Sequence, residues 1–189
     1  GRYNITTGSS IPMVDGTQWI GGGYSTETDS YHSQVRFNGA DLLSFNSANK
    51  DWMFFTGIGF DGKNQAHSFI QEEDITNAAE PILFHSTFTY CGFKNFNRAF
   101  MCRLSGVKVT NCFFQNNICG FEASGADNIV QDNYMSGSNW VLGGNSDPEG
   151  NYTTFSVILG SWRLSRFNRN YMTGWPQMHI HVIDSLNGS

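Results

Sequence analysis

The sequence predicts an all-β protein: a single-stranded, right-handed parallel β-helix with about 21 residues per coil and two loop insertions. Three observations predict it: few helix formers, a six-residue pattern that returns every 21 positions, and turn residues between the copies. The 189 residues include 21 Gly, 19 Asn and 16 Phe, but only 8 Leu and 8 Ala. Glycine and asparagine favour turns and phenylalanine suits strands, whereas leucine and alanine favour helices.

The repeat consists of six residues that begin and end with an apolar side chain. Its copies at 88–93, 109–114 and 130–135 are 21 residues apart. Similar segments occur at 55–60 and 167–172, at offsets of 33 and 37. In a β-helix each coil pairs with the next at roughly 4.8 Å, so equivalent positions stack into ladders.

The fourth position of the repeat predicts a ladder of Ile58, Cys91, Cys112, Asn133 and Asn170. We expect the first three to fill the core. The two asparagines are expected to hydrogen-bond along the stack and to turn backbone, which satisfies a buried amide. Cys91 and Cys112 would be neighbours, either as reduced thiols that fill apolar space or as a disulfide.

The pattern predicts one β-helix domain over residues 1–189, as a fragment of a longer chain. Its parts are opening coils (1–62), an insertion (63–83), regular coils (84–142), a second insertion (143–163) and further coils (164–189). Solenoid proteins place functional excursions in such insertions, so any chemistry is expected there.

Charge and spacing exclude several classes of function. The chain has 11 Lys and Arg against 16 Asp and Glu, a net charge of −5, so nucleic acid is not an expected partner. The chain has no run of 18 apolar residues, so we do not expect it to insert into a membrane. The four cysteines lack the paired spacing of a zinc site, and His179 with His181 has no identifiable third ligand. We therefore expect no metal and no cofactor.

The first third of the chain contains Tyr3-Asn-Ile-Thr, Thr17-Gln-Trp-Ile-Gly-Gly-Gly-Tyr-Ser-Thr26 and Ile58-Gly-Phe-Asp-Gly62. These segments resemble the opening coils of the pectate-lyase-like superfamily of right-handed parallel β-helices. The catalytic motifs of polygalacturonases and of plant-pathogen pectate lyases do not occur. With its low charge and its many Gly, Asn and aromatic residues, the chain looks most like phage tailspikes and polysaccharide depolymerases.

This resemblance implies a homotrimer, in a virion tail or secreted, whose partner is a bacterial surface polysaccharide such as capsule or O-antigen. It implies binding and cleavage of that glycan by an endo-acting glycoside hydrolase. Two alternatives stay open. One is a secreted polysaccharide lyase or epimerase, and the other is a non-catalytic β-helix that serves adhesion or assembly.

Hydrolysis of a glycoside needs two carboxyl groups, one with a raised pKa as acid and one ionised as base or nucleophile. The candidate catalytic residues are Asp147, Glu149, Glu122 and Asp132, around the second insertion. Asp132 has the alternative role of a surface ion pair, because it shares a ladder with Arg169. Asp147 and Glu149 also fit a turn.

Three tryptophans are candidate sugar-binding residues, because the apolar face of a sugar ring packs on an indole. They are Trp140, Trp162 and Trp175. Packing in the core or at a trimer interface is their alternative role.

Three arginines in one coil could bind the carboxylate of an acidic sugar in bidentate fashion, as a lyase requires. They are Arg163, Arg166 and Arg169. A solvent-facing strand edge is the alternative interpretation.

Overall fold

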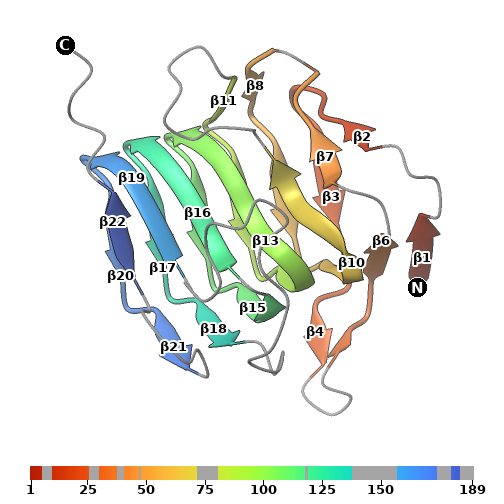
Figure 1. Ribbon diagram of the computed structural model, residues 1–189. Helices are drawn as coiled ribbons and strands as arrows, with labels where there is room; N and C mark the ends of the chain where they lie inside the picture. The colour runs from red at the N-terminus through yellow and green to blue at the C-terminus, as the bar shows by residue number, and fades with distance from the viewer. Residues whose placement is uncertain are drawn as a thin grey trace.

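The structure is a computed structural model that describes residues 1–5, 10–25, 30–37, 41–46, 48–71, 81–117, 119–137, 157–173 and 180–183. The described residues form β-strands and no helix (Figure 1). Within them, no helical segment is long and apolar enough to cross a membrane. The predicted all-β class with parallel strands is confirmed, and the arrangement is compatible with a parallel β solenoid.

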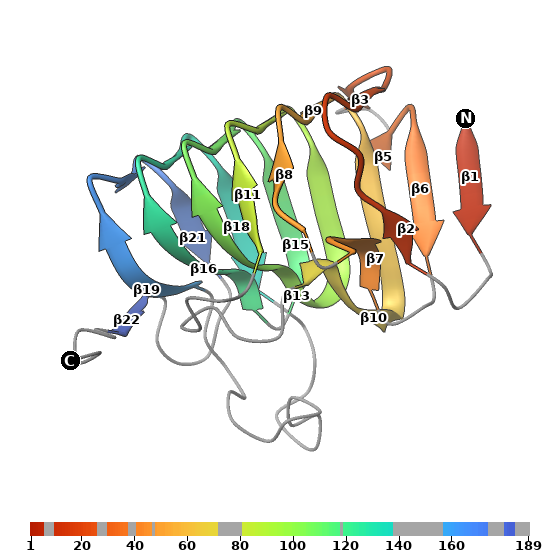
Figure 2. The ribbon, with the colours of Figure 1, turned by 90° about the horizontal axis from the view of Figure 1, so that it is seen from above.

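A fourteen-stranded sheet contains most of the strands, and its central path consists of seven parallel neighbours. In order they are β1 (Arg2–Ile5), β6 (Gln34–Phe37), β10 (Gly59–Gln71), β13 (Gly92–Ser105), β15 (Phe113–Asn117), β18 (Tyr134–Gly137) and β21 (Tyr171–Thr173). Figure 2 shows this path as one stack, with β1 at one end and β21 toward the other.

Seven further strands extend the same sheet around the molecule. They are β2 (Ile11–Pro12), β7 (Asp41–Ser44), β8 (Lys50–Asp51), β11 (Ile82–Phe84), β16 (Cys119–Ala126), β19 (Val157–Arg163) and β22 (His181–Ile183). The long strands β10 and β13 pair with both sets, so the sheet curls strongly. Residues 63–71 and 157–163, within the two expected insertions, therefore belong to strands β10 and β19.

A six-stranded parallel sheet forms the remaining wall, in the order β20-β17-β14-β12-β9-β3. Its strands are β3 (Gln18–Ile20), β9 (Phe54–Thr56), β12 (Thr87–Thr89), β14 (Lys108–Thr110), β17 (Ile129–Gln131) and β20 (Arg166–Asn168). A separate antiparallel hairpin is formed by β4 (Tyr24–Ser25) and β5 (Ser30–Tyr31).

The strands pair in a regular register in the middle of the chain. Gly92 of β13 pairs with Phe113 of β15, and Phe113 pairs with Tyr134 of β18, each partner 21 positions further along. The offset is 33 between Gly59 and Gly92, and 37 between Tyr134 and Tyr171.

Stacked phenylalanines fill the interior that the two sheets enclose. The rings of Phe55 and Phe88 lie 4.7 Å apart and nearly parallel, and those of Phe93 and Phe114 lie 5.1 Å apart. All four side chains are fully buried. Alternation along each strand sends these rings inward, because successive side chains of a strand point to opposite faces of its sheet.

Left-handed residues mark two lines of corners between the walls. One line contains Tyr90, Asn111, Asp132 and Arg169, with φ between 50° and 57°. The other contains Trp52, His85, Asp127 and Leu164, with φ between 43° and 58°. At such a corner the chain leaves one sheet for the next. Asn111 N still donates to Gln131 O, but the N–H of the following residue, Cys112, bonds to a side chain.

Buried amides satisfy the backbone at these corners. Asn133 Oδ1 accepts the N–H of Cys112 at 2.8 Å, and its Nδ2 donates to Val109 O at 3.0 Å and to Asn170 Oδ1 at 2.9 Å. Asn128 makes the equivalent bonds to Val107 N and Leu104 O. Each amide lies 21 positions after the N–H that it binds, so it joins neighbouring parallel strands of the stack. This confirms the prediction made for Asn133.

The fourth position of the repeat, which is Asn133 in one copy, is Cys112 and Cys91 in the two copies before it. Cys91 and Cys112 are buried and form no disulfide. The Cys112 thiol donates to Thr110 O at 3.3 Å and to Phe88 O at 3.5 Å. Burial raises the pKa of the Cys112 thiol well above its ordinary value, which keeps the group neutral. The reduced alternative for the pair is the one found.

We expect Asn133→Ala to lower the free energy of unfolding by about 2–4 kcal/mol, because it leaves Cys112 N–H and Val109 C=O buried without a partner. Asn168→Ala is the matched control, since Asn168 is exposed on β20 and should change stability by about 0.5 kcal/mol or less. Urea unfolding followed by circular dichroism measures both. Equal stability of the two variants would contradict this role for Asn133.

Candidate functional site

Three exposed aromatic rings line up along the outer surface of the fourteen-stranded sheet. Phe113, Tyr134 and Tyr171 occupy paired positions on β15, β18 and β21, which lie side by side in Figure 1. Their ring centroids are 5.9 Å and 5.3 Å apart, and the two tyrosines are stacked. The exposed fractions are 36%, 40% and 62%, so the aromatic row, as we call these three residues, presents its rings to solvent.

On the two strands before β15, the positions in register with the aromatic row are glycines. Phe113 pairs with Gly92, and Gly92 pairs with Gly59. The Tyr31 side chain lies over both: a Cβ on Gly59 would meet Tyr31 Cγ at 2.9 Å, and a Cβ on Gly92 would meet Cζ at 2.8 Å. Tyr31 therefore runs along the line of the row, from Gly59 toward Gly92, in space that any larger residue would take.

A pocket of about 290 Å³ opens at this end of the aromatic row. Its walls combine aromatic rings, two primary amides, one ammonium group and the backbone of the two glycines. The lining residues are Tyr31, Gln34, Gly59, Phe60, Gly92, Phe93, Lys94, Phe113, Gln115 and Tyr134. These groups can pack on an apolar ring face and hydrogen-bond to hydroxyl or carbonyl groups around it.

A buried carboxylate beside the pocket contacts Lys94 of the pocket wall and a second cation, Arg36. Asp61 is only 4% exposed, and its Oδ2 lies 3.4 Å from Arg36 Nε and 4.0 Å from Lys94 Nζ. Asn95 Nδ2 donates to Asp61 Oδ1 at 2.7 Å. Through these contacts Asp61 on β10 joins β6 to β13 and holds Lys94 at the pocket wall.

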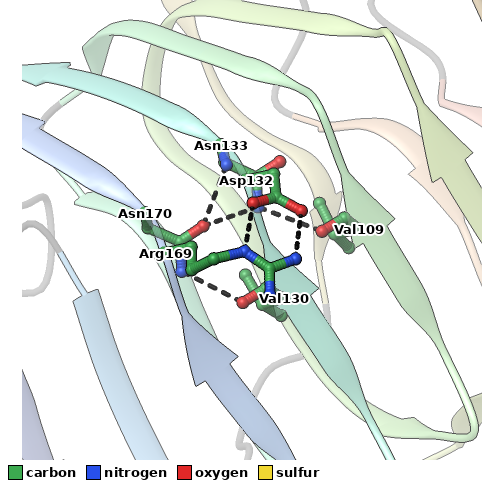
Figure 3. Close-up of polar contacts among 6 residues, drawn as sticks. All are labelled: Val109, Val130, Asp132, Asn133, Arg169 and Asn170. Carbon is green, nitrogen blue, oxygen red and sulfur yellow. Dashed lines mark hydrogen bonds and ion pairs between the residues drawn. The ribbon is translucent and has the colours of Figure 1, made fainter.

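Asp132, a predicted catalytic residue, forms a bidentate pair with Arg169, a predicted sugar-binding residue (Figure 3). Both hydrogen bonds are 2.7 Å long. The hydrogen bond from Arg169 holds the pKa of Asp132 below its ordinary value. A general acid needs a raised pKa, so this geometry matches the surface ion pair that was the alternative role for Asp132.

Glu122, another predicted catalytic residue, lies on β16 and is 4% exposed. Its Oε2 is 3.0 Å from Nε of Arg98, which is also buried, and Arg98 Nη1 contacts Met101 Sδ at 3.0 Å. Glu122 lies on β16 and Asp132 at the corner after β17. Each pairs with its own arginine, and neither lines the pocket.

The remaining described candidates lie near the C-terminal end of the stack. Trp162 is half-buried, and its ring meets the edge of Phe121 at 6.2 Å, which fits the packing alternative. Arg163 and Arg166 are exposed at the end of β19 and the start of β20. Asp147, Glu149, Trp140, Trp175 and His179 lie outside the described residues.

The aromatic row was not among the predicted site residues, although the sequence contains its signal. The fifth position of the six-residue repeat is Gly59, Gly92, Phe113, Tyr134 and Tyr171 in successive copies. Its neighbours on both sides point inward, so this position points outward. Tyr31 has no such signal, because it lies outside the repeat.

Among the described residues, no group of three or more His, Cys, Asp or Glu side chains could hold a metal ion. Comparisons with protein-family profiles, curated proteins and solved structures found no significant match to the chain.

The Tyr31 ring packs directly on Gly92. We expect Gly92→Ala to lower the free energy of unfolding by about 1–3 kcal/mol, because the new methyl group would overlap the Tyr31 ring. In a Tyr31→Ala background the same change should cost about 0.5 kcal/mol or less. A thermal double-mutant cycle measures both, and equal costs in the two backgrounds would contradict the contact.

Proposed function

We propose that the chain is a coil segment of a right-handed parallel β-helix of the pectate-lyase-like, tailspike type, with 21 residues in its regular coils. The 21-residue offset between paired strands supports the coil length. The hand follows from a general rule, since connections between parallel strands of one sheet are right-handed in about 98% of cases. The longer offsets of 33 and 37 correspond to coils that carry the two insertions.

The function that the geometry supports best is binding of a bacterial surface polysaccharide along the aromatic row. The observation that carries this proposal is the line of exposed, regularly spaced rings that ends in an amide-lined pocket. Exposed aromatic rings at fixed intervals suit a ligand that repeats, and a glycan repeats an apolar ring face along its length. The ring centroids follow one another at 5.9 Å and 5.3 Å, so the row offers continuous aromatic surface along the direction that a bound chain would take.

The polar groups of the pocket suit hydroxyl-rich ligands. Gln34 and Gln115 each offer two N–H donors and a carbonyl acceptor, and Lys94 offers three donors. Few charges and several neutral hydrogen-bonding groups distinguish this site from one built for a phosphate or a nucleic acid.

The proposal is limited to binding. Hydrolysis requires two carboxyl groups within roughly 5–10 Å of each other on either side of the scissile bond. The ten pocket residues include no Asp or Glu, and Asp61 next to them is held by Arg36, Lys94 and Asn95.

Binding can be tested on a panel of immobilised bacterial capsular and O-antigen polysaccharides. We expect retention by at least one of them, and Tyr134→Ala should weaken that binding about tenfold or more, as loss of a central aromatic contact does. Tyr90→Ala is the matched control, since Tyr90 is a similarly exposed tyrosine at the corner before β13 and is not among the residues that line the pocket. No retention on any glycan, or equal effects of the two variants, would refute the proposal.

The tailspike-type assignment also predicts a homotrimer. Size-exclusion chromatography with light scattering should therefore give about three times the 21.1 kDa chain mass. A monomer across the measured concentration range would contradict the trimer and favour a secreted, single-chain protein.

A further inference from the structure

The aromatic row differs at its two ends. Toward the C-terminal end of the stack it finishes on Tyr171, whose ring is 62% exposed. Toward the N-terminal end, the outward positions after Phe113 are Gly92 and Gly59, and both are covered by Tyr31. The line that a bound chain would follow is therefore occupied by Tyr31 beyond Phe113.

The occupying residue belongs to the β4–β5 hairpin, which stands near β6 and β10, at the N-terminal side of the line formed by β15, β18 and β21 (Figure 1). Tyr31 pairs with Tyr24 in this hairpin. Backbone hydrogen bonds tie its base to the stack: Gly23 N donates to Gly57 O at 2.8 Å, and Gly59 N donates to Ser33 O at 2.9 Å. These bonds anchor Tyr31 beside the strands that form the row.

The pocket lies where the row and Tyr31 meet, and both Phe113 and Tyr31 belong to its wall. Its volume of about 290 Å³ is at the lower end of the range for small-molecule sites, roughly 300–1,000 Å³, so it suits one or two sugar rings. Gln115 stands on β15, a strand of the row, and pairs with Lys94 on the neighbouring strand β13.

We propose that this site recognises the end of a glycan chain: the terminal residue enters the pocket, and the following residues lie on Phe113, Tyr134 and Tyr171. This inference rests on the proposed polysaccharide-binding function and adds the part of the polymer that is bound. An internal segment would have to continue through the space that Tyr31 fills above Gly59 and Gly92. Tyr31 is thus the residue that determines selectivity for chain ends.

The experiment compares the capsular or O-antigen polysaccharide retained on the panel with the same polysaccharide after partial acid hydrolysis to oligosaccharides. Both are titrated into the protein at equal mass concentration in a calorimeter. Recognition of ends predicts an apparent affinity per sugar residue at least tenfold higher for the hydrolysed sample, because it contains many more ends per unit mass. Recognition of internal segments predicts equal or weaker affinity for that sample.

Two variants test whether Tyr31 causes the preference for chain ends. Tyr31→Ala should open the row and reduce the preference for the hydrolysed sample to within about twofold, while Tyr90→Ala should retain the full preference. Circular dichroism and thermal unfolding establish that each variant is folded, and if Tyr31→Ala does not fold, the comparison on the unaltered protein decides. Binding without preference for the hydrolysed sample overturns this inference and leaves the proposed function standing. Absence of binding to both samples overturns the proposed function itself.

Discussion

The structure depends on satisfying the backbone groups that are exposed inside the molecule wherever a coil turns a corner. A backbone N–H that is buried there without a hydrogen-bond partner lowers the free energy of unfolding by about 1–3 kcal/mol. A nearby side chain can supply the partner in place of water. Asn133 and Asn128 supply that side chain, and each bonds to backbone 21 positions earlier in the chain. The bond forms only when the neighbouring strands are in register. It therefore stabilises the corner and also fixes the register between the strands.

A fixed register then determines which side chains become neighbours on the outer surface. Residues at the same place in successive coils become neighbours at strand spacing, whatever their chemistry. At Asp132 and Arg169 this produces a short ion pair, and at Phe113, Tyr134 and Tyr171 it produces the aromatic row. The row is therefore a consequence of the repeat, whereas its closed end depends on Tyr31, which reaches the row from outside the repeat.

The inner half of the fold could be predicted from the sequence, because inward positions carry a strong signal. Phe and Cys recur at apolar positions of the six-residue repeat, and Asn133 and Asn170 stand where an apolar residue would otherwise be. The outward half has a weaker signal, since aromatic, glycine and charged residues are all compatible with solvent. The position of Tyr31 could not be derived, because it depends on how the hairpin folds onto Gly59 and Gly92. Nor could the burial of Glu122, which follows from its contact with Arg98 on the neighbouring strand.

The central claim is that a glycan lies on the aromatic row, and nuclear magnetic resonance of ring-labelled tyrosine tests it most directly. The account predicts that titration with a retained polysaccharide fragment shifts the ring signals of Tyr31, Tyr134 and Tyr171. The signals of Tyr3 and Tyr90, which are 64% and 59% exposed, should stay in place. Shifts confined to Tyr3 and Tyr90, or shifts at none of the five while binding is measured independently, would contradict it.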